Sequence, residues 1–367
     1  MEKEVNDMTI NEKISSVIIP DVLSPFGERI ADKKSWTCVR DSIRDLLQRE
    51  EYGYIPAAPK SISVEELSSN GRFAAGKATL KHYKLTADTD SGEVSFNFAS
   101  VLPKTSGKIP LFVHINFRPE VPDSYQPTEE IIDRGYGVFS IHYEAVTSDD
   151  GDFDNGIAKV LVKDREDPHA TGKIALWSWA IMRVIDYIET QNYYDPERLA
   201  VIGHSRLGKT TLLTAAFDER VKFACANNSG NSGDAISRLT QGEKIADIVK
   251  RFPFWFCPAY AKYADNENSL PFDQHFLLAL TVPRTLLIGS ASLDAWADPA
   301  SEFISLTLTD EVYALYGMKG LVHGEDIPEA KSVLQDGDAS YHVRHGLHYL
   351  SREDWNIYMD FIDKKTK

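Results

Sequence analysis

From residue 110 onward, short apolar runs alternate with stretches of helical spacing, and this alternation constrains the fold more than any other feature of the sequence. Strands are predicted at residues 110–115, 137–142, 199–202, 223–226 and 285–289, and helices at residues 172–191, 208–216, 303–316 and 352–364. Buried strands that alternate with helices indicate a largely parallel sheet covered on both faces. We therefore expect an α/β fold whose chemistry lies at the carboxyl ends of the strands.

The first part of the chain has a different character. Residues 1–75 are predicted to form a leading arm, with an amphipathic helix near residues 36–51 and a turn rich in Pro, Ala and Ser over residues 55–63. Strand-like alternation follows at residues 78–85 and 94–102. Because no internal repeat or low-complexity linker divides the sequence, we expect residues 1–367 to form one catalytic domain on which the arm packs.

The composition limits the possible partners. The formal net charge of −15 argues against nucleic acid and anionic membranes, because the mean field of the protein would repel both. The cysteines Cys38, Cys225 and Cys257 have the spacing of neither a zinc site nor a redox pair, and we interpret them as reduced and structural. No apolar segment has the length of a signal peptide or a transmembrane span, so the sequence as written predicts a cytoplasmic protein, or a secreted one if a leader was trimmed.

A strongly apolar strand at residues 199–202 runs through a Gly-His pair directly into Ser205, and a helix follows at once. This context is typical of a nucleophile elbow, in which a tight turn projects the serine hydroxyl above the sheet. The backbone N–H of Arg206 is then free to donate to a developing oxyanion. The match to the G-x-S-x-G pattern is imperfect, because Leu207 occupies the position of the second glycine.

The same segment also matches a different motif. Residues 203–210 fit G-x-x-x-x-G-K-T, the phosphate-binding P-loop. A P-loop usually follows the first strand of its domain and needs an aspartate after a later strand to hold magnesium. Here several strand–helix units precede Ser205, and the next strand ends in Cys-Ala-Asn-Asn-Ser. We therefore favour the elbow, with a P-loop nucleotide-binding protein as the distant alternative.

The orienting acid of an α/β-hydrolase follows the serine in the chain, and the histidine follows the acid. The strand at residues 285–289 leads into Asp294 and Asp298, of which Asp298 precedes a proline as a helix N-cap would. Asp294 is closer to the end of the strand, and we predict that it is the acid.

Three histidines precede the last predicted helix and are candidates for the base. His342 is interpreted as a strand residue and His345 as a surface loop residue, whereas His348 lies deepest in the loop, after a glycine that permits the turn. We predict that His348 removes the proton of the serine hydroxyl as it attacks, because that hydroxyl is a poor nucleophile at neutral pH. The carboxylate would hold the imidazole in the correct tautomer.

With Gly-His-Ser-Arg-Leu-Gly-Lys at the elbow, the sequence resembles the glucuronoyl esterases of carbohydrate esterase family 15, which carry G-C/H-S-R-x-G-K there. The resemblance begins near Ile19 and continues through Asn-Asn-Ser-Gly-Asn-Ser-Gly, Phe-Pro-Phe-Trp-Phe, Trp-Ala-Asp-Pro and Gly-Leu-His. It implies an α/β-hydrolase three-layer sandwich. It also implies a serine esterase that cleaves esters of (4-O-methyl-)glucuronic acid, as in the lignin–glucuronoxylan linkages of lignocellulose, without a metal or another cofactor.

The resemblance further implies roles for particular residues. Arg206 would join the oxyanion site through its side chain, and Lys209, Glu243 and Trp296 would bind the sugar. Lys209 lies one helical turn after Ser205, so both side chains can face the mouth of the same pocket.

One departure from the family pattern bears on the acid. Some members place a glutamate triad acid at the position of Asn228, and an asparagine cannot serve as that anion, which supports Asp294. The substrate is a small-molecule or glycan ester in this interpretation. An acetyl xylan esterase or other carbohydrate esterase, and an inactive carbohydrate-binding hydrolase fold, remain alternatives.

Overall fold

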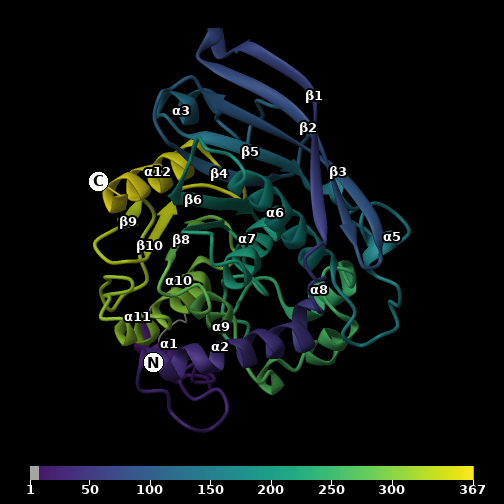
Figure 1. The fold of residues 1–367 in the computed structure, drawn as a ribbon. Coiled ribbons are helices and arrows are strands. Elements are labelled where there is room, and N and C mark those ends of the chain that lie inside the picture. The colour runs from purple at the N-terminus through teal and green to yellow at the C-terminus, as the bar shows by residue number, and fades with distance from the viewer. Residues whose placement is uncertain (1–7, 367) are drawn as a thin grey trace.

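The computed structural model describes residues 8–366, which are built around one ten-stranded sheet (Figure 1). The strand order across the sheet is β1-β2-β3-β5-β4-β6-β7-β8-β10-β9. The strands are β1 (Ser61–Phe73), β2 (Ala78–Thr89), β3 (Gly92–Pro103), β4 (Ile109–Asn116), β5 (Gly137–His142), β6 (Tyr194–His204), β7 (Phe223–Asn227), β8 (Thr285–Ala291), β9 (Ser332–Leu334) and β10 (Ser340–Arg344). The central strands from β5 to β10 in this order are parallel, whereas β1, β2, β3 and β9 pair antiparallel.

Helices cover both faces of the sheet, which confirms the expected α/β class with its three layers (Figure 1). One face carries α6 and α7, and the other carries α3 and α12. The α-helices are α1 (Ile10–Ser15), α2 (Lys33–Leu47), α3 (Thr128–Asp133), α4 (Tyr143–Val146), α5 (Ala158–Leu161), α6 (Lys173–Glu189), α7 (Arg206–Phe217), α8 (Ile245–Arg251), α9 (His275–Ala279), α10 (Pro299–Thr307), α11 (Asp310–Leu315) and α12 (Arg352–Thr366).

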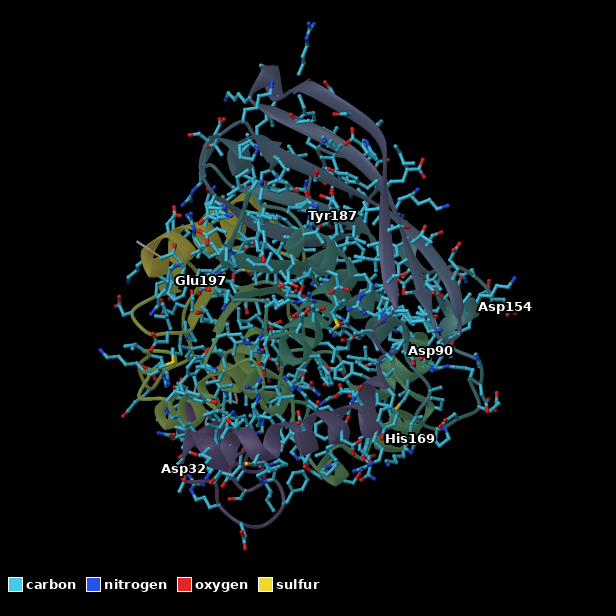
Figure 2. All side chains as sticks on the ribbon, viewed as in Figure 1. Asp32, Asp90, Asp154, His169, Tyr187 and Glu197 are labelled. Atoms are coloured by element: carbon cyan, nitrogen blue, oxygen red, sulfur yellow. The ribbon has the colours of Figure 1, made fainter. Side chains whose placement is uncertain are left out.

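Alternating side chains of the central strands supply two separate cores. On β4, Leu111, Val113 and Ile115 pack into the core under α6 and α7, and Phe112 packs into the core under α12. Side chains fill the space between the layers throughout (Figure 2). The strands are apolar on both sides because both sides are buried, which is why they read as continuous hydrophobic runs in the sequence.

Most of the predicted helices and strands are confirmed, but one predicted helix is wrong because the structure has two helices there. The helix predicted at residues 303–316 is divided into α10 and α11. The hydroxyls of Thr307 and Thr309 donate to the carbonyls of Ile304 and Leu306 at 2.8 and 2.7 Å. These side-chain bonds compete with the regular helical ladder and accompany the break.

The predicted leading arm contains a strand that the sequence did not indicate. Residues 61–73 form β1 at the edge of the sheet, where nearly every side chain is exposed. The amphipathic helix of this region is α2, continued by a π-helical turn (Gln48–Tyr52), and it buries Trp36, Ile43 and Leu47 in the main core. None of the helices in residues 8–366 combines the length and the apolar character that crossing a bilayer requires.

Candidate active site

Ser205 stands at the sharp turn between β6 and α7, at the carboxyl end of a central strand. Its backbone has φ 57° and ψ −129°, a conformation that residues other than glycine rarely adopt. The N–H of Ser205 donates to the carbonyl of Asn227 at 2.9 Å, and the N–H of Gly208 donates to the Ser205 carbonyl at 2.8 Å. Gly203 is required, because a Cβ there would lie 2.2 Å from the carbonyl oxygen of Leu207. This is the geometry of a nucleophile elbow.

Residues 203–210 do not form a phosphate-binding P-loop. The N–H groups of Ser205, Gly208 and Lys209 all donate to main-chain carbonyls, so they are not directed into an open loop. The ammonium of Lys209 is buried among protein acceptors and is not presented to a phosphate. The geometry therefore favours the elbow over the P-loop alternative.

His348 and Asp294 come from neighbouring parallel strands and meet above the sheet. Asp294 lies in the loop after β8 and His348 in the loop after β10, and Nδ1 of the imidazole is 2.5 Å from Oδ2 of the carboxylate. Burial by itself raises the pKa of Asp294, but the hydrogen bond and charge of His348, together with the hydrogen bonds from Ala297 and Asn228, outweigh it, so the pKa is below its ordinary value. With Nδ1 directed at a carboxylate, Nε2 of His348 is left to accept a proton.

The alternative candidates for the acid and the base do not take part in this contact. Asp298 caps α10 and accepts from the N–H of Ser301 at 3.3 Å. His342 is a buried β10 residue 2.8 Å from Asp354, and His345 is exposed in the following loop. The placements expected for His342, His345 and Asp298 are confirmed.

Ser205 and His348 line one small pocket at the carboxyl edge of the sheet. The same pocket is lined by the three predicted sugar-binding residues and by Asn228, Ser229, Gly230, Trp255 and Ala297. The structure therefore brings the predicted nucleophile, base and sugar-binding residues to a single site.

Arg206 begins α7, so its backbone N–H belongs to the first turn, whose amides have no intrahelical acceptor. Its guanidinium lies 4.5 Å from the ring centroid of Trp255, which lines the pocket, and it pairs with Asp149. Nε of Arg206 is buried and has no hydrogen-bond partner within residues 8–366. Arg206 is not among the residues that line the pocket, so its backbone N–H, one residue after Ser205, is the donor best placed for an oxyanion that forms only during reaction.

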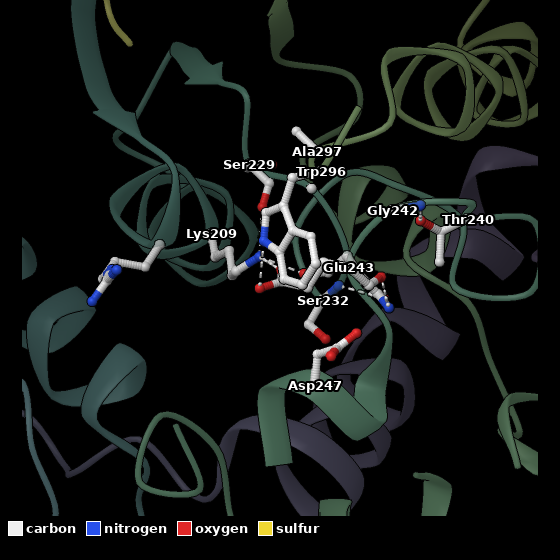
Figure 3. A network of polar contacts seen from close by, with 12 residues as sticks. Lys209, Ser229, Ser232, Thr240, Gly242, Glu243, Asp247, Trp296 and Ala297 are labelled. Atoms are coloured by element: carbon white, nitrogen blue, oxygen red, sulfur yellow. Dashed lines mark hydrogen bonds and ion pairs between the residues drawn. The ribbon is translucent and has the colours of Figure 1, made fainter. Parts of the chain in front are cut away.

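Lys209, Glu243 and Trp296 form one network (Figure 3). Nζ of Lys209 donates to the carbonyls of Ser229 (2.6 Å) and Asn231 and lies 3.2 Å from the Glu243 carboxylate. The other carboxylate oxygen of Glu243 accepts from the indole N–H of Trp296 at 3.3 Å. Lys209 lines the pocket as expected, but its three donor positions already have protein acceptors.

Sequence reasoning missed several residues of the site. Asn228, which we considered only as a missing acid, donates its amide N–H to Asp294 Oδ2 at 2.7 Å. Its position directly after β7 was the available signal, because the carboxyl ends of parallel strands meet at one edge. Asp149, which pairs with Arg206 but does not line the pocket, was also missed, since its loop has no motif. Within residues 8–366 no group of three or more His, Cys, Asp or Glu side chains is arranged to hold a metal ion.

Comparison with known proteins identifies the family. The family model described as "Glucuronyl esterase, fungi" matches residues 85–317. A carbohydrate esterase from an unknown prokaryotic organism is 31% identical over 96% of this chain and 90% of its own. A 4-O-methyl-glucuronoyl methylesterase from Wolfiporia cocos is 26% identical over 88% of this chain and 76% of its own.

Solved structures agree with the sequence comparisons. The structure of a glucuronoyl esterase from Solibacter usitatus is 32% identical, with a TM-score of 0.88, and the match covers 95% of this chain and 98% of that one. The matched region of the family model is more than half of the chain and includes Ser205, Arg206, Lys209, Glu243 and Asp294. The chain therefore belongs to the glucuronoyl esterase family, carbohydrate esterase family 15 of the α/β-hydrolases.

Proposed function

We propose that this protein is a serine esterase that hydrolyses esters of glucuronic acid or 4-O-methyl-glucuronic acid through an acyl-enzyme on Ser205. The observation that carries the proposal is the 2.5 Å contact of His348 with Asp294 at the pocket that His348 shares with the strained Ser205. Membership of the glucuronoyl esterase family supports the substrate class.

The proposed reaction has two steps. Ser205 Oγ attacks the C6 carbonyl of the uronate ester while His348 takes the hydroxyl proton. The oxyanion accepts from the backbone N–H and guanidinium of Arg206, and its collapse breaks the ester C–O bond as His348 returns the proton to the leaving alcohol. Water then attacks the acyl-enzyme in the same way, which releases the glucuronate and regenerates Ser205.

Recognition of the sugar is assigned to the Lys209–Glu243–Trp296 network. Trp296 is exposed, with 41% of its surface accessible, and Arg251 lies 5.0 Å from its ring centroid, so the ring face away from Arg251 can pack against a sugar. The Glu243 carboxylate is held by Lys209 and Trp296 and is buried, so a hydroxyl that donates to it would meet an oriented acceptor. The uronate ester is neutral at C6, so this network need not bind a charge.

The test compares benzyl and methyl glucuronate with acetylated xylose. The proposal predicts that kcat/KM for the glucuronate esters exceeds that for acetylated xylose by roughly tenfold or more. Ser205→Ala is the control and should abolish both activities. Faster cleavage of acetylated xylose would instead identify an acetyl xylan esterase.

Two further experiments address the remaining alternatives. An active-site-directed fluorophosphonate should label Ser205, and absence of labelling would support an inactive carbohydrate-binding fold. Magnesium-dependent binding of ATP would instead support the P-loop nucleotide-binding alternative. Absence of a nucleic-acid partner and a cytoplasmic or secreted location stay predictions, which binding assays and fractionation of the source cells would test.

A further inference from the structure

Asp149 lies in the loop after α4 and contacts two groups of the active site. Its Oδ2 accepts from Nη1 of Arg206, and its Oδ1 accepts from the indole N–H of Trp255 at 2.7 Å. The hydroxyl of Tyr143 lies 3.3 Å from the same Oδ2. The Asp149 side chain is 7% exposed and that of Arg206 is 24% exposed. Asp149 therefore holds a fixed negative charge directly against the predicted oxyanion arginine.

Aromatic rings surround this ion pair. The guanidinium carbon of Arg206 lies 4.5 Å from the ring centroid of Trp255, 5.1 Å from that of Phe252 and 5.8 Å from that of Phe117. Phe252 and Trp255 are themselves stacked, with centroids 3.9 Å apart. Rings packed in this way reduce the contact of the two charges with water, so each charge is screened less than it would be on an open surface.

The proposed reaction creates a charge at this place. The substrate is a neutral ester, and the product is a carboxylate whose oxygens arise where the oxyanion stood. An unpaired arginine there would bind the product more tightly than the substrate and slow its release. The buried cation that lines the pocket, Lys209, is 3.2 Å from Glu243. Arg251 lies over Trp296 but is exposed and therefore screened.

We propose that Asp149 enables the anionic product to leave, because its pairing with Arg206 cancels the positive charge that would otherwise retain the glucuronate carboxylate. Hydrogen bonding to the oxyanion does not require that net charge. The backbone N–H of Arg206, in the first turn of α7, can donate to the oxyanion while Nη1 is occupied by Asp149. The inference rests on the proposed function of the site.

The test measures inhibition by free glucuronate in wild type, Asp149→Asn and Asp149→Glu. The control is Asp154→Asn, which removes the same charge from the same loop, at a side chain that points outward at the edge of the molecule (Figure 2). Asp149→Asn keeps the size of the side chain and a hydrogen-bond acceptor. Asp149→Ser tests the same loss of charge if the asparagine variant does not fold.

Asp149→Asn should lower the Ki of glucuronate by about tenfold, the effect expected of one neighbouring charge in a partly desolvated site. Initial rates on benzyl glucuronate, and fluorophosphonate labelling of Ser205, should stay within a few-fold of wild type. Progress curves should slow early as product accumulates. In Asp149→Glu and Asp154→Asn, the Ki of glucuronate should equal that of the wild-type enzyme.

A purely structural role gives the opposite pattern. Damage to the loop would reduce initial rates and weaken the binding of glucuronate, whereas the inference requires tighter binding. A wild-type enzyme that cleaves benzyl glucuronate while Asp149→Asn and Asp149→Ser leave Ki unchanged or higher would overturn the inference alone. A wild-type enzyme that cleaves no glucuronate ester would overturn the proposed function and the inference with it.

Discussion

At the scale of single residues, one contact separates the two aspartates that follow β8. Asp294 meets His348 at 2.5 Å, and Asp298 caps α10. Asp294→Asn should therefore lower kcat on benzyl glucuronate by on the order of 10⁴-fold, because an amide no longer stabilises the imidazolium or its tautomer. Ser205→Ala and His348→Ala should each lower kcat by at least the same factor, since the nucleophile and the base act as a unit.

Asp298→Asn is the matched control for the acid. It should lower the melting temperature by weakening the cap on α10 and leave kcat within a few-fold of wild type. If kcat falls further in Asp298→Asn than in Asp294→Asn, the assignment of the acid is wrong.

Lys209 is expected to have two measurable roles. Lys209→Met leaves the buried Glu243 carboxylate without its cation, so the free energy of unfolding should fall by about 3 kcal/mol. KM for glucuronate esters should rise, while hydrolysis of an activated acetate ester should change little, because that ester does not use the sugar subsite.

The double variant Lys209→Met/Glu243→Gln tests the physical cause of the instability. It removes both charges, so it should recover part of the lost stability in urea unfolding. Equal loss of both esterase activities in Lys209→Met would place the lysine in the chemistry and not in sugar recognition.

At the scale of elements, the end of β10 determines where His348 stands. Arg344 is buried, and its guanidinium donates to the carbonyls of Leu347 (2.7 Å) and Tyr349, on either side of His348. Nε of the same side chain lies 3.0 Å from Asp354 of α12. Gly346 makes room for the guanidinium, because a Cβ there would lie 2.2 Å from Arg344 Nη1.

Arg344→Lys should therefore lower kcat by about tenfold or more with little change in KM, because a single ammonium cannot hold both carbonyls and His348 loses its alignment. The measurement is steady-state kinetics on benzyl glucuronate. Arg352→Lys, at an exposed position of α12, is the control and should match wild type. Unchanged kcat in Arg344→Lys would mean that the His348 loop keeps its position without these bonds.

At the scale of the whole molecule, Glu51 links the leading segment to the core and predicts a dependence of stability on pH. It is fully buried at the end of the π-helical turn, 3.2 Å from the amide of Gln274. Burial raises the pKa of Glu51 to about 8, and the charge of Asp273 adds to this. The folded state therefore holds a proton that the unfolded chain releases near pH 4.5.

The direction in which stability changes with pH follows from the raised pKa of Glu51. Stability from protonated Glu51 is fully present below about pH 4.5 and is lost as the pH rises through about 8. Glu51→Gln mimics the protonated form, so it should match wild type at pH 4 and be more stable at pH 9, by the order of a few kcal/mol. Urea unfolding at both pH values measures this, with the exposed Glu65→Gln as control. Equal pH dependence in wild type and Glu51→Gln would show that Glu51 is ionised in the folded protein.

The sequence by itself determined the features that depend on neighbouring residues. The apolar runs of β4, β5, β6, β7 and β8 and the abrupt turn at Ser205 are local patterns, and each appears in the structure at its predicted place. The order of Ser205, Asp294 and His348 along the chain was informative because parallel strands bring their carboxyl ends to one edge. Edge strand β1 escaped detection because it is stabilised by pairing with β2 and buries almost no side chains of its own.

Only the tertiary structure decided which distant side chains meet. Asp149 and Arg206 are separated by 57 positions, and no local pattern joins them. Spacing alone favoured Asp294 over Asp298 without deciding between them, until packing of β8 beside β10 put one of them against His348. The sequence predicted that Lys209 faces the mouth of the pocket. In the structure, residues 229–243 surround its ammonium with hydrogen-bond acceptors. The reason is common to all three: hydrogen bonds and ion pairs act over a few ångströms in space, and the packed sheet decides which residues come that close.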